Sequence, residues 1–242
     1  AASDVYKRQR LAWSDVEVIP SPSAFALARG RLAWSAAETA EITLHGRPLH
    51  SLDPYIAPGA RVLVLSWNEH TPRAVAMRLC ERGFERSRLT VFEHLNGDER
   101  RHDTSAVELA AQPETPAPFR ALNTLAIECI AGPRARVRSR VPGLRDDEYD
   151  SDGQLTKRVV RAATLSALAP MPGELLWDVG AGNGSVAIEW CRVHPSLRAF
   201  AIEADAQRLA RLVRNAVQLG APGVSAVPGR APEALEGLPP PD

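Results

Sequence analysis

The stretch LLWDVGAGNGSVAIEW, residues 175–190, constrains the fold of this chain more than any other. A short apolar run enters a loop with three glycines at alternate positions, and an amphipathic helical pattern leaves the loop. Glycines in such a loop let a ligand approach the backbone, because no side chain blocks it. A strand, a glycine loop and a helix in this order predict an α/β fold with a ligand site at the loop.

The residues on either side of the loop repeat the same alternation. A helix is predicted over 154–168, before the loop. After the loop come a strand at 198–204, a helix at 205–220 and a strand at 224–229. Asp205 is expected to cap its helix and Gly220 to end it.

The first half of the chain shows a second set of alternating elements. The run RVLVLS, residues 61–66, is typical of a strand buried on both faces. Further strands are predicted at 40–45, 87–95 and 122–130, with helices at 72–82 and 104–112. Strands that alternate with helices favour a mainly parallel sheet. We therefore expect two α/β units, over 10–132 and 146–242.

A change of composition separates these two units. The stretch GPRARVRSRVPGLRDDEYDSDG contains proline and glycine and passes from an arginine run to an acidic run. It is interpreted as a linker over 133–145, although a solvated turn would have the same composition.

Composition and charge exclude several classes of protein. The formal net charge is zero, which argues against a nucleic-acid partner. No apolar stretch reaches the roughly 18 residues of a membrane helix, so no membrane partner is expected. The three cysteines, Cys80, Cys129 and Cys191, are odd in number and lack metal-ligand spacing. This indicates reduced thiols in a cytoplasmic protein, and no metal site is expected.

Two classes of ligand fit the glycine loop. A dinucleotide site needs GxGxxG or GxGxxA and an acid about 20 residues later. Gly182, Gly184 and Ala187 meet that spacing, with Glu203 as the acid. The glycines are read more naturally as GxGxG, starting at Gly180.

The GxGxG pattern follows Asp178 in the strand, and this combination resembles the class I S-adenosylmethionine-dependent methyltransferases. The resemblance implies a Rossmann-like domain in which Glu203 accepts the ribose hydroxyls and the stretch GRAPEAL lies near the adenine. The cofactor-binding residues that it implies are Asp178, Gly180, Ala181, Gly182, Asn183, Gly184, Glu203 and Ala231.

Longer stretches resemble one family more specifically. Residues 146–190 and GRAPEAL are similar to the methyltransferase domain of the decarboxylating precorrin-6Y methyltransferases of cobalamin biosynthesis. Thr156, in the stretch Gly-Gln-Leu-Thr-Lys, would lie against the cofactor. The stretches VIPSPSAFALARGRLAW, LHGRPL and SRLTVFEHLNGDERR resemble the second half of a tetrapyrrole (corrin/porphyrin) methylase domain. The fold expected is therefore a partial tetrapyrrole methylase domain followed by the first half of a class I methyltransferase domain.

The resemblance implies a tetrapyrrole substrate, precorrin-6Y, and S-adenosyl-L-methionine as cofactor. It implies methylation at carbons 5 and 15 and loss of carbon dioxide from an acetate side chain, giving precorrin-8X, in a homo-oligomer. Elements that the family has before and after these stretches are missing, so we expect a chain truncated at both ends and inactive by itself.

The sequence identifies no catalytic residue. Glu189 and His194 are close to the loop, but a place on the helix surface is expected for each. An NAD-dependent oxidoreductase and a non-catalytic cofactor-binding module remain the alternative functions.

Overall fold

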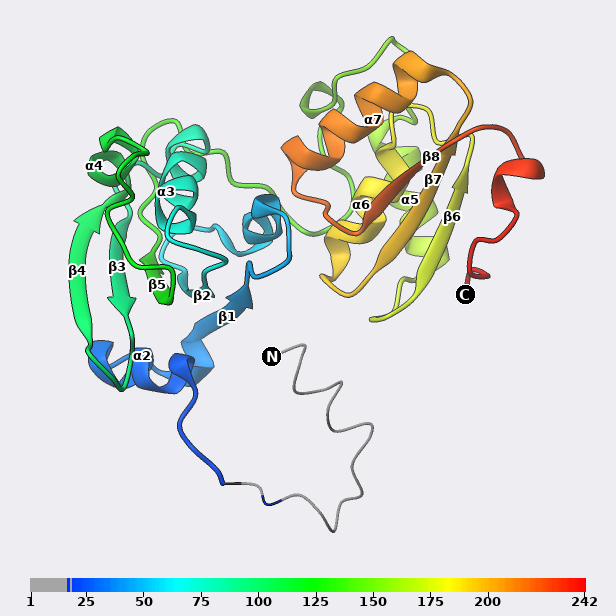
Figure 1. The fold of residues 1–242 in the computed structure, drawn as a ribbon. Coiled ribbons are helices and arrows are strands. Elements are labelled where there is room, and N and C mark those ends of the chain that lie inside the picture. The colour runs from blue at the N-terminus through cyan, green and yellow to red at the C-terminus, as the bar shows by residue number, and fades with distance from the viewer. Residues whose placement is uncertain (1–16, 18) are drawn as a thin grey trace.

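The computed structural model describes residue 17 and residues 19–242 (Figure 1). The predicted start of the first unit, at residue 10, lies outside the described residues. The described strands form two separate sheets, each with helices packed on it, so the predicted α/β class is confirmed. The limits of the two units stay a prediction.

The first sheet contains five strands in the order β1-β2-β5-β3-β4. Their bounds are β1 Thr39–Thr43, β2 Arg61–Leu65, β3 Arg88–Glu93, β4 Arg100–Ser105 and β5 Asn123–Glu128. Val62, Leu63 and Val64 of β2 have no exposed surface, so this apolar run is buried on both faces as predicted.

The prediction that this sheet is mainly parallel is wrong. Only β1 and β2 pair in parallel, whereas β5 runs antiparallel to both β2 and β3, and β4 antiparallel to β3. A parallel connection needs a crossover of a dozen or more residues. The turn between β3 and β4 is far shorter, so these two strands form a hairpin. The polar strand β4 has no apolar alternation from which it could have been predicted.

Helices cover both faces of the first sheet. Helices α3 (Thr71–Glu81) and α4 (Ala106–Ala111) pack on one face. Helix α2 (Ala24–Leu32) packs on the other, against Leu63 and Phe92.

Short 3₁₀ turns lie in the connections of both halves of the described chain: η2 Ala36–Glu38, η3 Leu49–Tyr55, η4 Asp146–Glu148 and η5 Glu233–Leu235.

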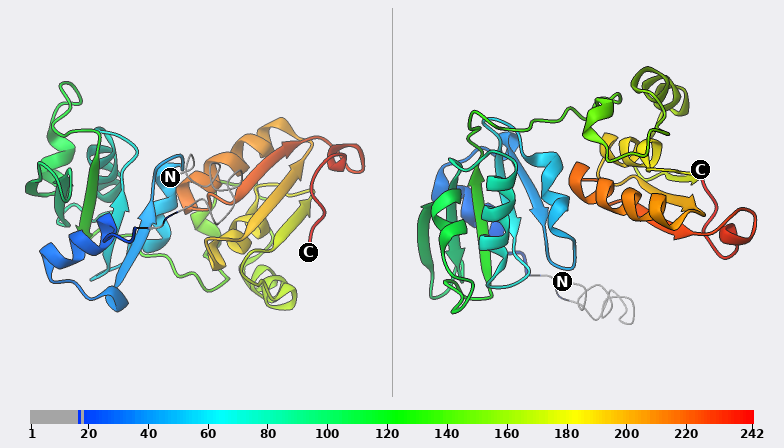
Figure 2. Two further views of the ribbon diagram at one scale, coloured as in Figure 1. Left: turned by 60° about the horizontal axis from the view of Figure 1, so that its bottom comes forward. Right: turned by 90° about the horizontal axis from the view of Figure 1, so that it is seen from above.

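The second sheet consists of β6 (Leu175–Val179), β7 (Arg198–Glu203) and β8 (Val224–Pro228), all parallel and in sequence order. Helices α5 (Arg158–Leu168), α6 (Ser185–Val193) and α7 (Ala206–Leu219) contribute to one buried cluster with Ala199 and Ala201 of β7. Figure 2 shows the helices of this unit beside its sheet. Parallel strands end at the same edge, so the loops after β6, β7 and β8 gather there.

The two ends of α7 show how well local signals predict the limits of a helix. Asp205 accepts hydrogen bonds from the backbone N–H groups of Gln207 and Arg208, both at 2.9 Å, and Gly220 ends α7 with a φ of 70°. Both predictions are confirmed. Helix α5, predicted from residue 154, starts at Arg158 because the residues before it form contacts with the glycine loop.

Side chains of the first unit and of the predicted linker contact the C-terminal end of α7. Asp53, between β1 and β2, is buried and accepts hydrogen bonds from Arg78 and Arg82 of the first unit. Arg78 also donates to the carbonyl of Val217 at 3.0 Å. Arg138, in the predicted linker, donates to the carbonyl of Gln218 at 3.4 Å. Guanidinium groups therefore satisfy the terminal carbonyls of α7, where the helix dipole favours positive charge.

Candidate functional site

The glycine loop between β6 and α6 adopts a backbone that side chains disfavour. Gly180, Gly182 and Gly184 have φ values of 76°, 58° and 79°, in the left-handed region. A Cβ on Gly184 would lie 2.6 Å from Leu212 Cγ, so this glycine permits close packing against α7. A Cβ on Gly180 or Gly182 would meet no atom of the described residues within 4 Å. The first two glycines therefore leave open space beside the backbone.

The loop is tied to the end of β7. The N–H groups of Gly180 and Ala181 both donate to the carbonyl of Ile202 at 2.9 Å. The N–H of Gly182 donates to Glu203 Oε2 at 2.8 Å. These bonds bring the predicted ribose-binding acid against the glycine loop.

Glu203 is a buried carboxylate with remaining acceptor capacity. Its exposed fraction is 8 %, and Oε1 accepts the N–H of Asp205 at 2.8 Å. A carboxylate has about four lone-pair sites. Each oxygen of Glu203 has one backbone donor and can accept another bond, so the group can receive two hydroxyls from a ligand.

Asp178 lies on β6 and points to the start of α6. Its Oδ2 accepts the N–H of Ala187 at 3.0 Å. Burial raises the pKa of Asp178 above the usual carboxyl value, and the negative charge of Glu203 raises it further. Asp178 therefore places a carboxylate at the first turn of α6, where a phosphate would otherwise be attracted.

Asn183 links the loop to the segment before α5, residues 150–157, which we call the strap. Its side-chain Nδ2 donates to Asp152 Oδ1 at 3.2 Å and to the carbonyl of Gln154 at 3.0 Å. The residue is 2 % exposed, and Oδ1 has no partner among the described residues. Asn183 therefore offers a buried acceptor beside the open part of the loop.

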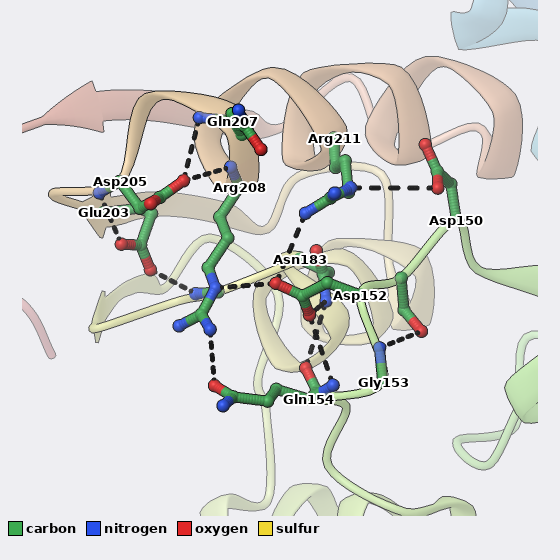
Figure 3. Close-up of polar contacts among 12 residues, drawn as sticks. Asp150, Asp152, Gly153, Gln154, Asn183, Glu203, Asp205, Gln207, Arg208 and Arg211 are labelled. Carbon is green, nitrogen blue, oxygen red and sulfur yellow. Dashed lines mark hydrogen bonds and ion pairs between the residues drawn. The ribbon is translucent and has the colours of Figure 1, made fainter.

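Helix α7 holds the strap from its other side (Figure 3). Arg208 donates to Asp152 Oδ2 at 2.8 Å and to Gln154 Oε1 at 2.5 Å. The Arg208 guanidinium, with the Asn183 amide, holds the pKa of Asp152 well below its usual range. Asn215, which is fully buried, pairs with both backbone groups of Asp150 at 2.9 Å. The strap is thus fixed against both the loop and α7.

The remaining predicted residues lie at the edges of this arrangement. Thr156 is in the strap with its side chain exposed, and its carbonyl accepts a hydrogen bond from Arg161. Ala231 is exposed in the turn after β8. In that turn Gly229 donates to the carbonyl of Glu203 at 3.1 Å, so the turn adjoins the acid.

The expectation that Glu189 lies on a helix surface is wrong. Its side chain is 2 % exposed and accepts bonds from the backbone of Gly143 and Leu144, the hydroxyl of Tyr149 and the Nε of Arg161. An acid at that position on α6 is buried because these donors compensate its charge. His194, after the end of α6, is partly exposed and pairs through Nδ1 with Ser196 Oγ at 2.7 Å.

Sequence reasoning missed the residues that hold the strap. Asp152, Arg208 and Asn215 carry no motif of their own. One signal was present: arginines at 208, 211 and 214 recur at helical spacing, opposite the acidic run that includes Asp150 and Asp152.

The described residues hold no group of three or more His, Cys, Asp or Glu side chains placed to bind a metal ion. None of the helices described is long and apolar enough to span a bilayer.

The chain is similar to known proteins of one kind. Residues 147–242 match the precorrin methyltransferase domain family. Over most of its length the chain is similar to the precorrin-6Y C(5,15)-methyltransferases [decarboxylating]. The Sinorhizobium protein of that name is 44% identical over 234 residues, which are 97% of this chain and 56% of the relative. The Mycobacterium tuberculosis protein is 39% identical over 92% of this chain and 54% of the relative.

A solved structure carries the same name. The C-terminal domain of precorrin-6Y C5,15-methyltransferase from Rhodobacter capsulatus is 48% identical, covers 43% of this chain and 56% of that chain, and has a TM-score of 0.41. The chain spans about half the length of the curated relatives that it matches. The resemblance predicted from the sequence is confirmed.

Proposed function

We propose that the protein methylates precorrin-6Y at carbons 5 and 15 with S-adenosyl-L-methionine as donor, and decarboxylates an acetate side chain to give precorrin-8X. The observation that carries the proposal is the contact between Glu203 and Gly182 across the open glycine loop. The names of the relatives supply the substrate. By the same resemblance we propose a cytoplasmic homo-oligomer.

The residues at the loop fit this methyl donor. The donor carries no phosphate, so the loop needs close approach and hydroxyl acceptors more than free amides. Glu203 can accept two ribose hydroxyls, each bond to a charged acceptor contributing roughly 1.5–3 kcal/mol. The open backbone at Gly180 and Gly182 admits the rest of the ligand. The bound sulfonium supplies an activated methyl group, and the task of the chain is to orient it and exclude water.

A dinucleotide fits the same loop poorly. The amides of its GxGxxA pattern are engaged: Gly182 donates to Glu203, Gly184 to Ala181, and Ala187 to Asp178. A pyrophosphate needs free N–H groups and no adjacent negative charge. The loop would instead present it with the carboxylates of Asp178 and Glu203.

The experiment uses a version of the protein extended to the length of its relatives, incubated with precorrin-6Y and S-adenosylmethionine. The proposal expects a product that has gained two methyl groups and lost one carbon dioxide, read by mass spectrometry. Glu203→Ala should strongly reduce turnover, whereas Glu236→Ala, at an exposed acid outside the loop, should leave it unchanged. Cofactor binding without any change of product mass would favour the non-catalytic module.

A further inference from the structure

A buried charged cluster lies behind the strap, on the side away from α7. Its centre is the pair Arg161 on α5 and Glu189 on α6, whose exposed fractions are 0 % and 2 %. Arg161 Nε donates to Glu189 Oε1 at 2.5 Å, and the guanidinium lies 4.7 Å from the ring centre of Tyr149. Neither side chain reaches the open part of the glycine loop.

The guanidinium of Arg161 joins three segments of the chain: the residues around Leu144, the strap and α6. Its NH2 donates to the carbonyl of Leu144 at 2.5 Å, and its NH1 donates to Asp146 and to the carbonyl of Thr156. Only arginine has the planar fork with five donors that such a set of acceptors requires. The C-terminal end of the strap is therefore fixed by this one side chain.

Glu189 connects this fixed point to the glycine loop. It lies on α6, about one turn after Gly184, and the first turn of α6 is rigid because Ile188 donates to the carbonyl of Gly184 at 2.9 Å. The middle of the strap, at Asp152 and Gln154, is held by Asn183, the residue before Gly184. The middle and the C-terminal end of the strap are therefore both tied to the glycine loop and the helix that follows it.

The physical cost of this cluster indicates what it does. A buried ion pair adds little net stability, because desolvation of two charges offsets their attraction, and apolar side chains of similar volume often stabilise as well. When every donor and acceptor of the charged pair has a hydrogen-bond partner, however, the pair specifies one geometry. In this cluster the geometry specified is the position of the strap relative to the loop.

We propose that Arg161 and Glu189 are positioning residues for the methyl-donor site: they fix the strap so that Thr156 lies beside the ligand held by the glycine loop. The proposal rests on the proposed function of that loop. Arg161 and Glu189 act through the strap and touch neither cofactor nor substrate.

The test compares two buried arginines that donate hydrogen bonds to different segments of the chain. Arg161→Lys keeps the charge but cannot reach Glu189 and Thr156 together. The matched control is Arg192→Lys: Arg192 is 6 % exposed and donates to the carbonyls of Leu219 and Ser139, neither of which belongs to the strap. Both variants should lower the melting temperature. Only Arg161→Lys should weaken binding of S-adenosylhomocysteine, by about tenfold, which corresponds to the loss of one charge-assisted contact.

A second readout separates positioning from general destabilisation. Hydrogen exchange at the N–H of Asp150, which donates to Asn215, reports the strap alone. It should accelerate in Arg161→Lys and stay unchanged in Arg192→Lys. If Arg161→Lys does not fold, Glu189→Gln, which removes the charge with little change of shape, takes its place and should weaken binding less.

The outcomes distinguish this proposal from the proposed function. No binding by the unchanged protein would contradict the methyl-donor site itself. Binding by the unchanged protein that both Arg161→Lys and Arg192→Lys retain equally would overturn the positioning role alone. Loss of folding in both Arg161→Lys and Glu189→Gln would also overturn it, because the pair would then be required for folding.

Discussion

The N–H of Gly182 donates to the carboxylate of Glu203 at 2.8 Å, joining the middle of the glycine loop to the end of β7. A loop of glycines has many accessible conformations, and ordering it on ligand binding would cost conformational entropy. The bond to Glu203 holds the loop in one of these conformations, which lowers that cost. The acid therefore shapes the loop, and under the proposed function it also offers acceptors to the ribose.

The raised pKa of Asp178 predicts a pH-dependent stability. Burial disfavours the charged carboxylate, so the folded protein binds the proton more readily than the unfolded chain does. The free-energy cost of burying the charged Asp178 carboxylate is present above the raised pKa and is relieved as the pH falls through that pKa. Asp178→Asn removes the charge and keeps an acceptor for Ala187. We expect the variant to be more stable than the unchanged protein at neutral pH and the difference to shrink toward pH 4, measured by denaturant unfolding. A constant difference over that range would contradict this account.

The contacts of the strap lead us to expect that a substitution outside the glycine loop will weaken cofactor binding. Asp152→Asn weakens the pairing with Arg208 and Arg211, so the strap should be ordered less often. We expect weaker binding of S-adenosylhomocysteine with little change in melting temperature, measured by calorimetry and thermal unfolding. Asp147→Asn is the control, because Asp147 pairs only with its exposed neighbour Arg145. Equal affinities in the two variants would show that the strap does not contribute to binding.

The contact between the two sheets depends on one buried acid. Asp53→Asn leaves the guanidinium groups of Arg78 and Arg82 without the buried carboxylate that they share. Breaking a buried pair by removing one partner costs about 3–5 kcal/mol, and we expect a loss of unfolding free energy of that order. Glu81→Gln, at an exposed partner of Arg78, should cost less than about 1 kcal/mol. A small effect of Asp53→Asn would mean that the contact does not stabilise the fold.

Burial also predicts the order in which the thiols react. It raises the pKa of Cys191 to about 12 and of Cys129 to about 11. Cys80 is only half-buried, and its pKa is also raised, chiefly by desolvation. Since the thiolate is the nucleophile, an aromatic disulfide reagent at neutral pH should modify Cys80 first and the other two only on unfolding. Rapid modification of Cys191 in the folded protein would contradict its burial.

The second sheet could be predicted from the sequence because its signals are local. The apolar run before Gly180, the cap at Asp205 and the stop at Gly220 each act within a few residues, and each lies where it was expected. The same holds for the buried strand at 61–66.

The features of the fold and the site that were not predicted depend on contacts between segments far apart in the sequence. The direction of β5 is set by pairing with β2 and β3, and no property of residues 122–130 indicates it. The start of α5 is delayed by bonds from the strap to Asn183. Glu189 is buried only because Arg161 and the backbone around Leu144 come to it. Contacts between residues far apart in the sequence determine each of these features, and a single sequence does not show which residues will be in contact.

The most direct test of the central claim is a pair of calorimetric titrations, with S-adenosylhomocysteine and with NAD, into the same protein. The account predicts binding of S-adenosylhomocysteine alone, strongly weakened in Glu203→Ala and unchanged in Glu236→Ala. Binding of NAD and not of S-adenosylhomocysteine would contradict the assignment of the glycine loop, and with it the proposed reaction.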